Sequence, residues 1–119
     1  MNNQIDKMIA ATNGTVLKKA QKLLDSGDVL NVQFSADEDG CMFDALISHQ
    51  GGILMPYLLM GDEDALVCQC EKEEKMCVHK AALLLAAQVM REMDCPDYRE
   101  AMKWKVARTL ESTLGKAIQ

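Results

Sequence analysis

Three cysteines and a histidine fall within twelve consecutive positions, and this cluster constrains the fold more than any other stretch of the chain. One residue separates Cys68 from Cys70, one residue separates Cys77 from His79, and six residues lie between the two pairs. Thiolates and an imidazole are the ligands of tetrahedral Cys₃His zinc sites, in which four protein ligands leave no open position for water or substrate. The spacing therefore predicts one Zn²⁺ in a structural role.

Each ligand pair also predicts the local structure that carries it. Residues i and i+2 of a strand point to the same face, so Cys68 and Cys70 can both reach one ion from the end of an extended segment. In a helix with 3.6 residues per turn, the same spacing separates two side chains by roughly 200°. We therefore expect Cys77 at or just before a helix start and His79 in the first turn, with the apolar run 81–87 inside that helix.

This order of features resembles the SWIM zinc finger, in which Cys-x-Cys, a short spacer, Cys-x-His and an apolar Ala/Leu helix follow one another. The matching residues are the four ligands and residues 80–84, and the order of elements extends the resemblance over a zinc-binding core at 15–93. Two positions depart from the family pattern, because Glu71 stands where Pro is frequent and Val78 where Lys is frequent. The family occurs in bacterial Swi/Snf-type helicase-like ATPases, Mutator-type transposases and some kinase-associated ubiquitin ligases.

The resemblance implies a recognition module that binds nucleic acid or a protein partner, as a domain or relative of a helicase-like or DNA-processing machine. A second interpretation is a free-standing protein–protein interaction protein, regulatory or inhibitory, that uses zinc only as a structural staple. An affinity for DNA that does not change between about 50 and 200 mM salt would count against the nucleic-acid interpretation.

The cysteines also have interpretations without metal. A disulfide is one, although Cys68 and Cys70 are too close to bridge comfortably, and plain buried thiols are another. Cys41 alternates with apolar positions and is expected to be a buried thiol, whereas Cys95 lies beside Pro96 and is read as incidental. His49 lies in a glycine-rich turn, where we expect a solvated loop residue rather than a fifth ligand.

Composition restricts the class of protein. The chain has 119 residues, 49% hydrophobic and 26% charged, which predicts one soluble domain over 1–119. It shows neither a signal peptide nor an apolar run long enough to span a membrane, so five cysteines indicate a reducing, cytoplasmic location. The net charge of −5 argues against a protein that relies on non-specific phosphate contacts.

Periodicity predicts an α+β fold with N-terminal helices, a small antiparallel β-meander leading into the Cys₃His site, and two C-terminal helices. Four helices are expected: over 1–13, from Thr15 to Gly27 with Thr15 as the cap, from the zinc ligands to near Met93, and within 94–119. The first strand is expected from Val29, with Leu30, Val32 and Phe34 pointing inward. Further strands are expected over 41–47, 53–60 and 65–68, and Pro56 indicates a sheet edge or a bulge in the strand at 53–60. Asp94 or Asp97 is expected to cap the last helix, whose apolar stripe includes Tyr98, Ala101, Met102, Val106 and Leu110.

Candidate contacts to nucleic acid or a protein partner lie in three places, with simple solvation of a charged surface as the alternative. They are Lys18, Lys19 and Lys22 on the outer face of the second helix, Lys72 and Lys75 between the two ligand pairs, and Lys103, Trp104 and Lys105 in the last helix.

The motifs of several enzyme classes are missing. The chain has no glycine-rich phosphate loop, no Gly-x-Ser-x-Gly and no Cys-x-x-Cys redox pair. His49 would be the one histidine left to act as a base, and no nucleophile is paired with it in the sequence. We therefore expect neither an enzyme nor a small-molecule substrate.

Overall fold

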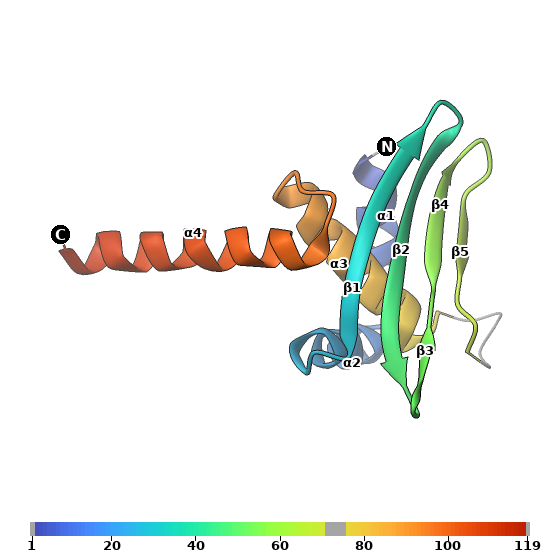
Figure 1. Ribbon diagram of the computed structural model, residues 1–119, viewed down its shortest axis with the longest axis horizontal. Coiled ribbons are helices and arrows are strands. Elements are labelled where there is room, and N and C mark those ends of the chain that lie inside the picture. The colour runs from blue at the N-terminus through green and yellow to red at the C-terminus, as the bar shows by residue number, and fades with distance from the viewer. Residues whose placement is uncertain (1, 71–75, 119) are drawn as a thin grey trace.

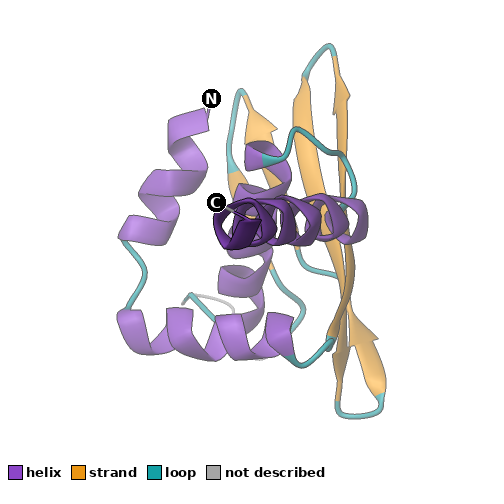
Figure 2. Cartoon of the chain, turned by 90° about the vertical axis from the view of Figure 1, so that its left-hand side faces the viewer, coloured by secondary structure: helices purple, strands orange, loops and turns teal. Residues whose placement is uncertain are grey.

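Helices cover one face of an antiparallel sheet and leave the other face open (Figures 1 and 2). The computed structural model describes residues 2–70 and 76–118. The elements follow in the order α1 Asn2–Ala10, α2 Gly14–Asp25, β1 Val29–Asp37, β2 Gly40–His49, β3 Gly52–Leu54, β4 Tyr57–Gly61, β5 Ala65–Val67, α3 Val78–Glu92 and α4 Tyr98–Ile118. This order confirms the predicted fold class.

The sheet is built around β2, which pairs with β1 on one side and with β3 and β4 on the other; β5 pairs with β4. The strand predicted over 53–60 is broken at Pro56, which has no backbone N–H for a ladder. Its carbonyl still accepts a hydrogen bond from the Ala45 amide at 3.0 Å. The break lets both short strands remain paired with β2.

The core lies between the inner face of the sheet and α3. Alternate residues of β2 are buried, from Cys41 to Ile47, as their spacing predicted. Helix α3 is buried over most of its surface, because α1 and α2 pack against it opposite the sheet. The alanines of α3 allow this close approach on both sides. An ion pair joins α3 to α1, with 2.8 Å between a guanidinium nitrogen of Arg91 and a carboxylate oxygen of Asp6.

The predicted inward position of Leu30 is wrong. The register between β1 and β2 shifts between Val29 and Asn31, so Val29 and Val32 are buried while Leu30 is 43% exposed. A bulge of this kind reverses the faces of the residues on either side of it.

Two helix caps are now assigned. Asn13, not Thr15, caps α2, because its side-chain oxygen accepts a hydrogen bond from the Thr15 amide at 2.8 Å. Gly27 follows the end of α2 with φ of +84°, which suits glycine after a helix. Asp97 caps α4 by accepting a hydrogen bond from the Glu100 amide at 3.1 Å.

Helix α4 is held to the body only at its start and then projects from it (Figure 1). Tyr98 and Ala101 are buried, but Val106 and Leu110 are 52% and 57% exposed, so the predicted stripe contacts the body in its first turns alone. The start of α4 is fixed to the edge strand β1, where the Phe34 amide donates to the Pro96 carbonyl at 2.8 Å.

Candidate metal centre

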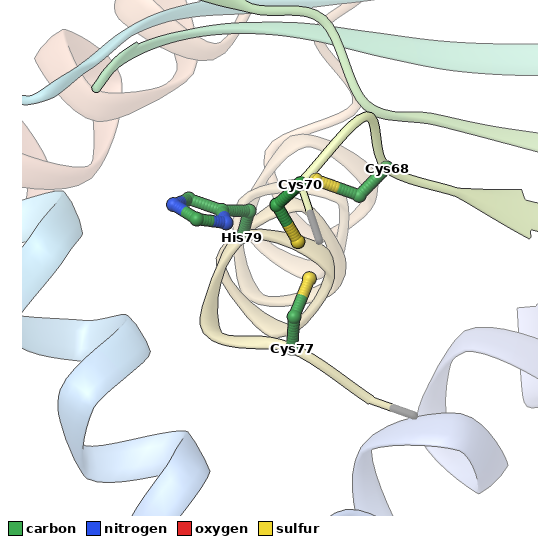
Figure 3. A group of neighbouring side chains, drawn as sticks. All are labelled: Cys68, Cys70, Cys77 and His79. Carbon is green, nitrogen blue, oxygen red and sulfur yellow. The ribbon is translucent and has the colours of Figure 1, made fainter. Parts of the chain in front are cut away.

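The four predicted ligands meet where β5 ends and α3 begins. Cys68 and Cys70 directly follow β5, Cys77 is the residue before α3, and His79 lies in its first turn. One ligand atom from each residue lies within 4.8 Å of all the others. Figure 3 shows the three sulfur atoms and the imidazole gathered at the start of the helix. The chain therefore contains a Cys₃His cluster that could hold a metal ion.

Cys77 is fixed in place by the helix that it opens. Its extended backbone and its side chain act as the cap of α3, with Sγ accepting a hydrogen bond from the Lys80 amide at 3.4 Å. The unpaired amides at a helix N-terminus are available donors for a side chain placed just before the helix. This explains physically why the third ligand precedes the helix, as its spacing predicted.

Gln69 positions the first ligand pair, a role that the sequence pattern does not reveal. Its side-chain amide donates to the Met55 carbonyl at 2.8 Å, and its oxygen accepts from the Met55 amide at 2.9 Å. These two bonds fasten the residue between Cys68 and Cys70 to the break between β3 and β4. The sequence shows that a glutamine stands between the two cysteines of Cys-x-Cys, but it does not show that Met55 is the hydrogen-bond partner.

The cluster is largely shielded from water. Cys68 and Cys77 are 5% and 3% exposed, and Cys70 and His79 are half-buried. Burial, reinforced by the neighbouring cysteines, raises the pKa of the Cys68 thiol to about 12. A buried cation opposes this effect, because it stabilises the thiolate and replaces the proton.

His49 packs against the cluster instead of lying in a solvated loop, which corrects the sequence expectation. It is the last residue of β2, is half-buried, and its ring meets the His79 ring edge-on, with centroids 4.9 Å apart. Gln50 and Gly51 form a tight turn with positive φ, so His49 still pairs with Gly52 as part of the ladder between β2 and β3. It supports the His79 ring from the side.

The donor set fits zinc in both chemistry and size. Three sulfurs and one nitrogen suit tetrahedral Zn²⁺, and Zn–S bonds of about 2.3 Å place ligand atoms about 3.8 Å apart. The observed limit of 4.8 Å lies within small side-chain rotations of that arrangement. The identity of the metal remains a prediction.

The predicted partner contacts lie on separate elements. Lys18, Lys19 and Lys22 are exposed on α2, and Lys103, Trp104 and Lys105 are exposed on α4. Lys72 and Lys75 lie outside the described residues. Lys103 is 3.6 Å from Glu100 of the same helix, an exposed pair that contributes little to stability. Cys41 is buried in the core as expected.

Comparison with known proteins found no matching family model, curated protein or solved structure. Within the ranges that the structure describes, none of the helices combines the length and apolarity needed to cross a lipid bilayer.

Proposed function

We propose that the chain is a zinc-stabilised recognition module of the SWIM type whose partner is a protein. The observation that carries the proposal is the Cys₃His cluster, whose ligand atoms lie within 4.8 Å of one another. The order of elements supports the SWIM assignment, since a β-meander delivers Cys-x-Cys and a helix start delivers Cys-x-His.

In this proposal zinc acts as a structural staple. It joins the last strand of the sheet to the central helix α3. Zinc-finger peptides bind the ion with apparent energies of about 10–16 kcal/mol. Whole domains are stable by only about 5–15 kcal/mol. The ion therefore contributes enough to decide whether β5 and the start of α3 are folded. Four protein ligands also leave no open position for catalysis, so we assign no enzymatic activity.

The projecting helix α4 supports a protein partner. Trp104 is 62% exposed and Val106 and Leu110 are more than half exposed, on a helix that leaves the body of the fold. Tryptophan is enriched among the residues that dominate protein–protein binding energy. The module would act in the cytoplasm, either within a helicase-like or DNA-processing machine or as a free-standing regulatory protein.

The nucleic-acid alternative rests on exposed lysines of α2 and α4. A net charge of −5 opposes it, because nucleic-acid affinity comes largely from phosphate neutralisation. Titration of a labelled DNA duplex at about 50 and 200 mM salt distinguishes a protein partner from a nucleic-acid partner. We expect no salt-sensitive binding of the duplex. Strong binding that weakens steeply with salt would favour the nucleic-acid alternative.

Metal content and chelation test the staple directly. We expect about one zinc per chain, and loss of helical circular dichroism when the purified protein is treated with a strong chelator. Cys70→Ala should abolish stoichiometric zinc, whereas Cys95→Ala, outside the cluster, should retain it. Unchanged circular dichroism after complete metal removal would refute the proposed role.

A further inference from the structure

The open face of the sheet carries an apolar strip across three strands. Met42 of β2 lies opposite Leu59 of β4, and Tyr57 of β4 lies opposite Val67 of β5, all on the face away from α3. Leu46 extends the strip along β2, and Leu46 and Leu59 are 41% and 40% exposed. An antiparallel sheet that faces water normally places polar residues outward. We call this strip the open sheet face.

Helix α4 presents apolar side chains that its own body does not cover. Val106 and Leu110 are four residues apart and share one side of the helix, following Met102, which is half-buried at the body. We call Val106 and Leu110 the α4 strip. Each chain thus exposes two apolar surfaces, one on a helix and one on a sheet.

The two surfaces carry opposite charge. Through residue 111, α4 has four basic side chains against Glu100 and Glu111. The open sheet face carries Asp44 between Met42 and Leu46, and two exposed turns at one end of the sheet hold acidic residues at 37–39 and 62–64. Complementary charge of this kind steers association and disfavours wrong partners.

The two surfaces of one chain do not meet. Helix α4 lies in the helical layer and points past the edge strand β1, away from the open face of its own sheet (Figures 1 and 2). A two-fold rotation about an axis along the strands would turn a second copy over and would let each α4 reach the open sheet face of the other copy. Such an interface is self-complementary, as two-fold dimers require.

The geometry points to a second copy of this chain as the protein partner, bound by reciprocal docking of each α4 strip on the other copy's open sheet face. This inference rests on the proposed protein-binding role of α4 and names the partner. Stable interfaces bury about 800 Å² on each partner. A single helix–sheet contact buries a small part of that area, and reciprocal docking doubles it. Zinc is needed only to keep the sheet and α3 together.

Sedimentation equilibrium of the zinc-loaded protein tests the inference. We expect a particle of twice the 13.2 kDa chain mass. Leu110→Glu and Leu46→Glu should each raise the dimer dissociation constant by about tenfold or more, because each places a charge in an apolar contact. Arg108→Gln changes the net charge by the same amount on the opposite side of α4, where Arg108 is exposed, and should leave the dimer intact. Circular dichroism and zinc content should remain unchanged in all three variants.

Mixing the two disruptive variants gives the sharpest outcome. The Leu46→Glu chain retains its native α4 strip, and the Leu110→Glu chain retains its native open sheet face. An equimolar mixture therefore restores one of the two contacts and should form a heterodimer more tightly than either variant forms a homodimer. Loss of dimer in both variants without this recovery would overturn reciprocal docking.

The remaining outcomes separate this inference from the proposed function. A zinc-loaded protein that stays monomeric up to hundreds of micromolar, or a dimer insensitive to both substitutions, would overturn the inference and leave the zinc staple standing. A dimer that forms equally well without metal would instead contradict the staple. Binding of DNA by α4 in place of dimerisation would also overturn the inference.

Discussion

Cys68 must lose a proton before it can bind a metal, and its surroundings oppose that loss. Burial is the main reason that the pKa of its thiol is raised from 9.0 to about 12. The backbone amide of Cys70 opposes this shift, and the side chains of Cys70 and Cys77 add to it. Cys77 lies at the start of α3, where its sulfur accepts a hydrogen bond from the Lys80 amide. At the scale of single residues, the cluster is therefore a place where protons and a metal ion compete.

This competition predicts that zinc affinity falls as the pH falls. A thiol whose pKa lies far above neutrality is protonated in the metal-free site, so each binding event must release its proton. We expect apparent affinity to fall by about tenfold per pH unit for each proton displaced. A competition titration with a chromophoric chelator between about pH 6 and 8 measures the slope. Cys95→Ala should keep that slope, and pH-independent affinity would argue that thiolates are not the ligands.

At the scale of elements, Asp97 decides how α4 is attached. The Asn31 side-chain amide donates to its carboxylate at 3.0 Å, and the Glu100 amide donates at 3.1 Å. The first of these bonds is the main reason that the pKa of Asp97 lies below its usual 3.8. One carboxylate thus caps the helix and joins it to the edge strand β1.

Removing this cap should loosen α4. We expect Asp97→Ala to lower the free energy of unfolding of the zinc-loaded protein by about 1 kcal/mol, as for other N-caps. Because the folded pKa is lowered, the stabilisation is full above the unfolded pKa of 3.8 and is lost as the pH falls through the folded pKa. Urea unfolding at neutral pH measures the loss, with Asp62→Ala in an exposed turn as the control. Equal stability of Asp97→Ala and the parent would show that the cap is not important.

Much of each element could be predicted from local pattern. The alternation from Cys41 to Ile47 and the ligand spacing carry their own geometry, since strand and helix periods fix which side chains share a face. Other features depend on contacts between distant residues. The Val29/Asn31 register shift that exposes Leu30 and the clamp of Gln69 on Met55 are set by tertiary packing. For the same reason, the glycines after His49 predict a loop, whereas His49 ends β2 and packs against His79.

At the scale of the whole molecule, periodicity identifies an apolar face but does not say what covers it. Val106 and Leu110 follow the spacing of a buried stripe, yet α4 leaves the body before reaching them. Leu46 and Leu59 likewise lie on the uncovered side of the sheet. These residues are explained if a second copy supplies the missing cover.

The central claim is that Cys68, Cys70, Cys77 and His79 bind one zinc ion, and X-ray absorption spectroscopy at the zinc edge tests it most directly. We expect three sulfur ligands at about 2.3 Å and one nitrogen at about 2.0–2.1 Å, with no water in the first shell. The spectrum of Cys95→Ala should be identical. A shell dominated by oxygen or nitrogen, or one with fewer than three sulfurs, would contradict the account.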